Sequence, residues 1–215
     1  MLRHFSLKNP VLAICLVFLA SACHEAANGP TATYRKQILS ERAVKDSLFA
    51  IAGKSPMPAT ELKDFHGLHY YDVDPQLRFE GPIIPVENAP IDTILGSKGD
   101  KRPAQKFGYF KFDYQGKFYQ LAVYRMLSRK PGFEDYLFLG FFDGNSGEST
   151  YGGGRYIDLT LNPQNHYTVD FNLAYNPYCA YGGDYSCAVP PLENKLDFAL
   201  NAGEKSWHYG VLTII

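Results

Sequence analysis

The chain has 215 residues, a formal net charge of −1, and 15% aromatic residues, with 16 Tyr and 15 Phe. Because the charge is mild and no basic run exceeds two residues, the composition argues against a nucleic-acid-binding protein. The length after an export signal suits one domain with a sizeable core, and the many aromatic rings favour strands over helices.

The N-terminus has the features of an export signal. Arg3, His4 and Lys8 form a short basic segment, and residues 11–22 that follow are apolar or small. This apolar run is shorter than the roughly 20 residues needed to span a bilayer, so it fits the central part of a signal peptide. We therefore interpret residues 1–22 as a signal peptide.

The end of that run, residues 19–23 (Leu-Ala-Ser-Ala-Cys), resembles the lipobox of bacterial lipoproteins. The resemblance implies that the Cys23 thiol accepts the diacylglycerol and that acyl chains such as palmitate anchor the protein to the cell envelope. In a Gram-negative host we expect the outer membrane, since His24 rather than Asp follows the cysteine. Residues 23–33 are interpreted as the lipidated tether. The alternative is a secreted protein cleaved after Ala22.

A helix is predicted over residues 34–49, because apolar residues recur there at helical spacing. Thr31 or Thr33 can cap its first turn, while Gly53 and Pro56 end it. The pattern is amphipathic, so we expect one face of this helix to pack on the rest of the domain.

From about residue 65 onward, short aromatic-rich runs separated by turn residues predict strands. These runs cover residues 67–73, 77–86, 107–114, 118–127, 136–142, 156–161, 167–174, 196–200 and 209–215. Gln115-Gly116 indicates a hairpin, Pro82 and Pro85 limit their run to an edge strand, and residues 175–194 look irregular. We predict a single globular domain over residues 34–215 that is mainly β, or α+β at most. Its core would be an antiparallel curved sheet, a partly closed barrel or a sandwich, with one N-terminal amphipathic helix.

Two cysteines remain for the folded domain after Cys15 leaves with the signal and Cys23 takes the lipid. An oxidising envelope favours a disulfide between Cys179 and Cys187. A metal site would need two further ligands, for which His166 and His208 are nearest in sequence, and no metal-binding motif is present. We therefore expect a disulfide, no metal and no cofactor.

An ordered set of motifs makes the C-terminal half specific. It comprises Phe142-Asp143, residues 147–156 with Gly-Gly-Gly-Arg, Asp170-Phe171-Asn172, residues 174–181, Cys187, Pro190-Pro191, Glu193-Asn194 and residues 202–205. With Ser55-Pro56 and residues 65–70, this set resembles the bacterial and archaeal family called domain of unknown function 1684. The resemblance covers roughly residues 34–208. It implies a common fold, but no established activity, cofactor or catalytic residue.

Gly152, Gly153, Gly154 and Arg155 form the most unusual of these motifs. Consecutive glycine amides can hold an anion, and Arg155 would add a bidentate donor for a carboxylate or phosphate. The alternative is a glycine bulge at a bend of the sheet, with Arg155 paired to an internal Asp or Glu.

The remaining polar motif residues are Asp170, Asn172 and Glu204, which we group with Gly152–Arg155 as a tentative ligand-binding set. We favour a non-catalytic domain that binds a small anionic or polar ligand, or a protein partner of unknown kind. A hydrolase or lyase that uses Arg155 with Asp170 or Glu204 is the first alternative. In a purely structural envelope domain, the second alternative, these residues would all bond to one another.

Overall fold

The computed structural model of the chain describes residues 29–127 and 131–207. The centre of its main sheet is a long hairpin of two aromatic-rich strands. β4 (Lys101–Tyr114) and β5 (Lys117–Met126) pair antiparallel over almost their whole length. Gln115 and Gly116 both have positive φ, of 53° and 75°, as a two-residue hairpin turn of the primed type requires. The predicted hairpin is confirmed, although β4 begins at Lys101.

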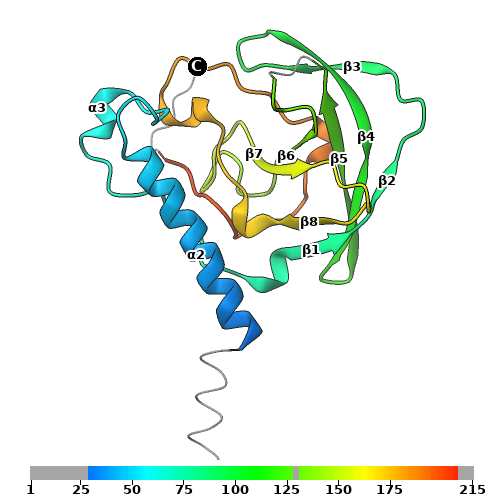
Figure 1. Ribbon diagram of the computed structural model, residues 1–215, viewed down its shortest axis with the longest axis horizontal. Coiled ribbons are helices and arrows are strands. Elements are labelled where there is room, and N and C mark those ends of the chain that lie inside the picture. Colours follow the sequence, from blue (N-terminus) through cyan, green and yellow to red (C-terminus); the bar gives the residue numbers. More distant parts are fainter. Residues whose placement is uncertain (1–28, 128–130, 208–215) are drawn as a thin grey trace, which may run out of the picture.

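The other strands are antiparallel as well, which confirms the predicted fold class (Figure 1). The main sheet also contains β2 (Ile83–Pro85), β3 (Ile91–Leu95), β6 (Tyr136–Phe141) and β7 (Arg155–Thr160). A second, two-stranded sheet consists of β1 (Arg78–Gly81) and β8 (Tyr167–Asp170). The main sheet has the order β2-β4-β5-β6-β7, with β3 also paired to β4. Within the described residues β2 and β7 do not pair, so the sheet stays open instead of closing into a barrel.

The helical elements differ from prediction at the N-terminal end. They are α2 (Pro30–Phe49), α3 (Ala59–Leu62), η1 (Pro75–Leu77), η2 (Phe171–Leu173), η3 (Tyr178–Tyr181) and η4 (Leu192–Asn194). The N-cap of α2 is Gly29, without a side-chain cap, so the predicted Thr31 and Thr33 caps are wrong. Pro30 occupies the first turn, where its fixed φ suits a helix and its missing N–H costs nothing. Residues 30–33 of the predicted tether are therefore helical.

Several predicted strands are absent, and one strand was missed. Residues 67–73 make only an isolated bridge from Tyr70 to Glu204, and residues 196–200 run along loop segments without joining a ladder. The strand predicted over 167–174 turns into η2 after Asp170. β3, where no strand was predicted, is an edge strand with mostly exposed residues. The signal peptide, Cys23 and residues 209–215 lie outside the described residues.

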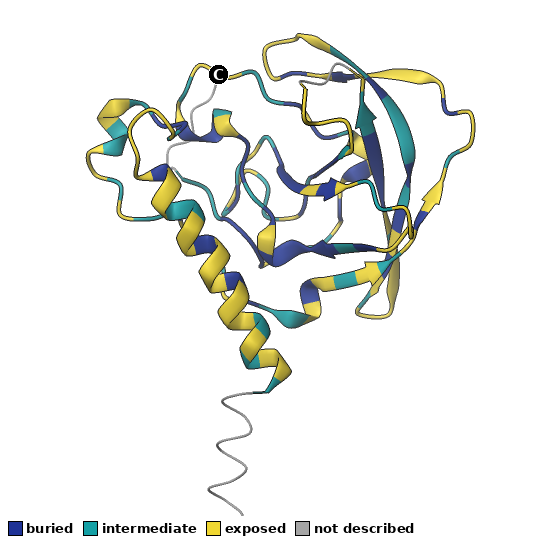
Figure 2. Cartoon of the chain, viewed as in Figure 1, coloured by how far each residue is buried: buried dark blue, intermediate teal, exposed yellow. Residues whose placement is uncertain are grey.

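Apolar side chains cover both faces of the main sheet. On β5, Leu121 and Val123 join the larger core with Phe110 and Phe141, whereas Ala122 and Tyr124 point to a second cluster on the opposite face. This follows the two-residue period of a strand. A third cluster lies at the C-terminal end of α2, which is otherwise largely exposed (Figure 2). Only Ile38, Arg42 and Phe49 of α2 are buried, so part of the predicted apolar face remains in solvent.

One buried side chain joins β5 to β6 where their own ladder is short. β5 and β6 pair only at Tyr124–Phe138 and Arg125–Leu137. The Asn194 amide nitrogen donates to the carbonyls of Ala122 and Gly140, each at 2.8 Å, and its oxygen accepts from the Ala122 amide at 2.7 Å. Asn194 thus replaces the missing strand-to-strand hydrogen bonds.

Replacing Asn194 with Ala is expected to lower the free energy of unfolding by roughly 3 kcal/mol or more, because three buried backbone groups lose their partner at about 1 kcal/mol or more each. Urea unfolding measures the change. Asn201, whose exposed side chain bonds among the described residues only to Asn145, is the matched control, and Asn201→Ala should change stability by less than about 0.5 kcal/mol. Equal losses in the two variants would contradict this role.

Candidate functional site

A cavity of about 540 Å³, lined mostly by polar residues, lies between α2 and the strands β1, β7 and β8. We call it the polar cleft. Its polar lining residues are Tyr34, Gln37, Glu41, Arg42, Lys45, Tyr70, Arg78, Asp158, Thr168, Asp170, Asn172, Tyr175 and Glu204. The volume is within the range of small-molecule sites, so the cleft is large enough for a ligand.

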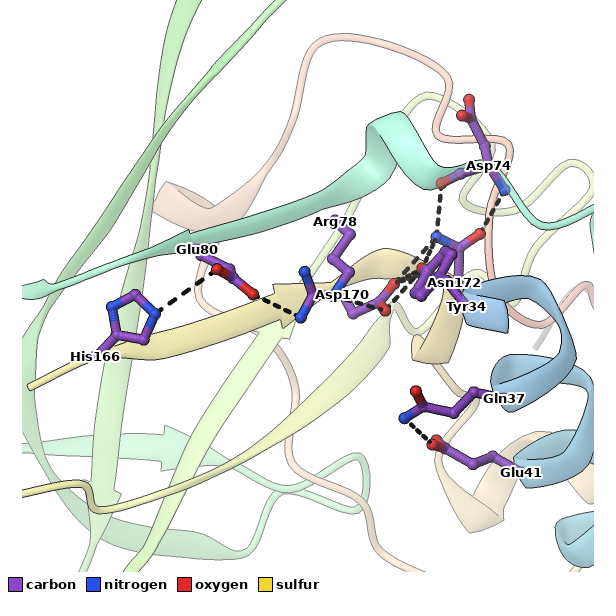
Figure 3. A network of polar contacts seen from close by, with 9 residues as sticks. All are labelled: Tyr34, Gln37, Glu41, Asp74, Arg78, Glu80, His166, Asp170 and Asn172. Atoms are coloured by element: carbon purple, nitrogen blue, oxygen red, sulfur yellow. Dashed lines mark hydrogen bonds and ion pairs between the residues drawn. The ribbon is translucent and has the colours of Figure 1, made fainter. Parts of the chain in front are cut away.

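The wall of the cleft nearest the start of α2 is a hydrogen-bonded network (Figure 3). Asp170 accepts from the Tyr34 hydroxyl at 2.8 Å and from the Asn172 amide at 2.9 Å, which also caps η2. Burial, reinforced by the hydrogen bond to Asp170, raises the pKa of Tyr34 above its ordinary value. The hydroxyl therefore stays protonated and holds α2 against β8.

Asn172 uses its whole side chain in the same network. Its amide nitrogen donates to the carbonyl of Asp74 at 2.7 Å, and its oxygen accepts from the Asp74 amide at 2.8 Å. The Asn172 carbonyl in turn accepts from Nη2 of Arg42 at 3.1 Å, while Nη1 donates to the carbonyl of Tyr71 at 2.8 Å. Burial lowers the pKa of Arg42, whose Nε has no partner among the described residues. These contacts fasten α2 to the loop before β1.

Glu204 closes the other end of the cleft and is almost fully buried. One carboxylate oxygen accepts from Lys45 of α2, and the other accepts from the Tyr181 hydroxyl at 2.5 Å and the Asn176 amide at 3.0 Å. Burial and the Glu204 charge raise the pKa of Tyr181 well above its ordinary value. Both carboxylate oxygens of Glu204 are therefore engaged within the protein.

The two buried carboxylates of the cleft are engaged inside the protein, whereas two of its cations keep free donors. Asp170 and Glu204 each accept at least three hydrogen bonds or ion pairs from internal groups, whereas Arg78 and Lys45 are partly exposed. Nη2 of Arg78 lies 2.6 Å from the carboxylate of Glu80, and its Nε lies 3.9 Å from the carboxylate of Asp170 (Figure 3). A guanidinium has five N–H groups and an ammonium three, so both cations keep donors for a further acceptor.

Arg155 lies away from this cleft and is completely buried. Its Nη2 donates to Asp143 at 2.9 Å and to the carbonyl of Leu200 at 3.1 Å. Its Nη1 donates to the carbonyls of Ala202 and Glu204. The guanidinium thus makes the internal ion pair that the sequence analysis left as the alternative to an anion site.

The three glycines form the turn that leads into β7. The Gly154 amide donates to the carbonyl of Tyr151 at 3.1 Å, and Gly154 has φ of 82°. A Cβ there would lie 2.7 Å from the carbonyl oxygen of Phe141, so only glycine fits. Gly152, Gly153 and Gly154 do not line the polar cleft.

Of the tentative ligand-binding set, Asp170, Asn172 and Glu204 therefore meet in one cavity, whereas the glycines and Arg155 do not join them. Arg155 contacts the backbone carbonyl of Glu204 rather than its carboxylate, and within the described part of the chain its guanidinium makes no hydrogen bond to Asp170. The geometry gives no support to an acid–base pair built on Arg155.

The sequence analysis missed the contribution of α2. Tyr34, Ile38, Arg42 and Lys45 follow each other at three or four residues, so they lie on the face of α2 that lines the cleft. The predicted apolar face of this helix rests on the same spacing. The polar residues that recur at that spacing were the sequence signal for a cleft along the helix.

The cysteines Cys179 and Cys187 are neighbours in space and are both thiols in the structure. The Cys179 amide donates to Sγ of Cys187 at 3.1 Å, and the Tyr151 hydroxyl lies 3.6 Å from Sγ of Cys179. The hydrogen bond from Cys187 lowers the pKa of Cys179 to about 6, and the same contact raises the pKa of Cys187. The disulfide stays a prediction.

Among the described residues no group of three or more His, Cys, Asp or Glu side chains is arranged to hold a metal ion. In the same part of the chain, no helix has the length and hydropathy of a membrane span.

Arg155→Ala should reduce the free energy of unfolding by about 3–5 kcal/mol, because Asp143 would stay buried without its cation. Chemical unfolding of the variant measures this loss. Arg35 is exposed on α2 and is the matched control, so Arg35→Ala should leave stability almost unchanged. A stable Arg155→Ala protein would show that the pair does not hold the fold.

Cys179 and Cys187 should resist alkylation until a reductant is added. After reduction, the alkylation rate of Cys179 should rise with pH and level off above a midpoint near pH 6, because the thiolate is the nucleophile. In Cys187→Ala the midpoint should move up, since the stabilising thiol donor is gone. Mass spectrometry of each peptide measures both rates. A wild-type midpoint at the ordinary thiol pKa would rule out the thiol contact.

Comparison with known proteins gives a family but no activity. A search against curated proteins finds no match. The solution NMR structure of an uncharacterized protein from Haloarcula marismortui is similar, with 34% identity and a TM-score of 0.61, over 81% of this chain and 95% of that chain. The family model described as protein of unknown function (DUF1684) matches residues 63–205. The chain therefore belongs to the DUF1684 family.

Proposed function

We propose that this protein is an exported envelope lipoprotein, anchored through Cys23, whose domain binds a small anionic or polar ligand in the polar cleft. The observation that supports the ligand proposal is the presence of two cations with free donors at the cleft. The buried carboxylates Asp170 and Glu204 are engaged by internal donors, while Arg78 and Lys45 keep donors at the open cavity.

A carboxylate or phosphate suits this arrangement, since a guanidinium from β1 and an ammonium from α2 offer charge-assisted hydrogen bonds in one cavity. Glu41 and Asp158 also line the cleft. They favour a ligand that carries a donor, such as a hydroxyl or an amine, besides its anionic group.

The anchor would keep the cleft close to the membrane. α2 begins at Pro30, seven residues after Cys23, and seven extended residues span at most about 25 Å. Tyr34, the first residue of α2 that lines the cleft, lies one turn further along. The ligand would thus be met near the lipid surface.

Cys23→Ser should move the protein from the membrane fraction to the soluble envelope fraction, because the acyl acceptor is lost. Metabolic labelling with palmitate, followed by fractionation, measures this. The Cys179→Ser variant is the control and should remain labelled and membrane-bound. A wild-type chain that takes up no palmitate would exclude the anchor.

Arg78→Gln should weaken binding of the ligand at least tenfold while the fold is kept, because Arg78 is partly exposed and supplies a charged donor. The measurement is NMR titration or thermal shift with a panel of hydroxycarboxylates, amino acids and sugar phosphates. Arg35→Gln, at an exposed position of α2 that does not line the cleft, is the charge-matched control. If no compound of the panel perturbs the wild type, the polar cleft is not a site for this class.

A purely structural domain is the second candidate. It is favoured by the burial of Arg155, Asp170, Asn172 and Glu204, each of which is at most 5% exposed and bonded inside the protein. The ligand titration separates the two, since a structural domain would show no saturable response at the cleft.

A further inference from the structure

A second cavity, of about 710 Å³, lies beside the polar cleft and has a different chemistry. We call it the aromatic pocket. Seven aromatic side chains line it: Phe49, Tyr136, Phe138, Tyr156, Tyr175, Tyr178 and Tyr185. Lys45, Asp158 and Tyr175 line both cavities and so form their common wall.

Neighbouring rings of the pocket stand nearly perpendicular to each other. Phe138 and Tyr156 are 5.0 Å apart at 79°, and Tyr156 and Tyr175 are 5.8 Å apart at 81°. Faces and edges of rings therefore alternate along the wall. A flat aromatic molecule can meet such a wall both by offset stacking and edge to face, the two arrangements that aromatic pairs prefer.

The hydroxyls of the deeper rings are held inside the protein. Tyr156 donates to the carbonyl of Ala188, and Tyr175 donates to Asp158 at 2.6 Å. Burial and the Asp158 charge raise the pKa of Tyr136 and of Tyr175. These rings are therefore fixed and neutral, and they offer a preformed apolar surface.

Positive charge dominates the charged groups of the pocket. Lys45, Lys54 and Arg102 line it against the single carboxylate of Asp158, which already accepts from Tyr175. Arg102 is held by Asp100, 2.8 Å from Nε, and by the carbonyl of Ser186, 2.6 Å from Nη2. Within the described part of the chain Nη1 makes no hydrogen bond, so Arg102 keeps a donor for a ligand.

We propose that the aromatic pocket is a second binding site, for a small molecule that joins a flat aromatic ring system to an anionic group. The rings bury the flat part, and Arg102 with Lys54 binds the carboxylate, sulfonate or phosphate. This chemistry differs from that of the polar cleft, whose ligand needs no ring. The volume accommodates a fused two-ring compound with its acid group.

The probes are 1-naphthoate and the neutral, nearly isosteric 1-naphthamide, with acetate as the ring-free anion. They are titrated into the full chain carrying Cys23→Ser, and isothermal calorimetry and NMR shifts are recorded. Naphthoate should bind at least about tenfold more tightly than naphthamide, because it makes one additional charge-assisted contact. Acetate should show no saturable binding.

Three variants locate the site. Arg102→Gln should weaken naphthoate about tenfold and leave naphthamide unchanged, whereas Tyr185→Ala should weaken both probes. Arg78→Gln, which alters the polar cleft alone, should change neither. Lys54 is exposed, so Lys54→Gln serves as a second charge variant if Arg102→Gln does not fold.

Absence of saturable naphthoate binding would overturn the proposal, as would equal affinity for naphthamide. Loss of naphthoate binding in Arg78→Gln, with binding kept in Arg102→Gln, would move the aromatic ligand to the polar cleft and equally overturn it. Because the two cavities are tested by different variants and different probes, the polar-cleft proposal can fail while this one holds, and the reverse.

Discussion

The buried guanidinium of Arg155 is the constraint on which the rest of the structure depends. A charge removed from water is costly unless it is paired and hydrogen-bonded, so the chain around it has to supply an anion and several carbonyls. Asp143 supplies the anion, and the segment from Leu200 to Glu204 supplies three carbonyls. A segment that belongs to no strand is thereby held against β7.

The position of that segment decides where Glu204 points. Its carboxylate meets Lys45 of α2 on one side and Tyr181 on the other, and α2 is held a second time through Tyr34 and Asp170. Two such attachments fix a helix whose outer face is largely in solvent. They also leave space between helix and sheet, which is where both cavities lie.

The motif residues thus divide between two tasks. Arg155, Gly154 and Asn194 satisfy buried groups or tight turns and line neither cavity, whereas Asp170, Asn172 and Glu204 form part of the wall of the polar cleft. Arg78 and Arg102, which lie outside the motifs, keep hydrogen-bond donors at the cavity surfaces. An unusual sequence motif is therefore evidence for a demanding backbone or a buried charge, and not by itself for a binding site.

What the sequence alone determined is local. Short aromatic-rich runs, the Gln115-Gly116 turn and the prolines after Gly81 were enough for the antiparallel β class, the central hairpin and the interrupted edge strand. Only the tertiary structure decided which polar groups are partners. Tyr34 and Asp170 are 136 residues apart in the sequence, and for Arg155 the sequence left both an internal carboxylate and an external ligand open as partners. Local pattern records which face of an element is apolar, whereas a polar contact depends on how distant elements pack. The same physical reason explains why the cavities, built from side chains of α2, β6, β7 and an irregular segment, could not be read from the sequence.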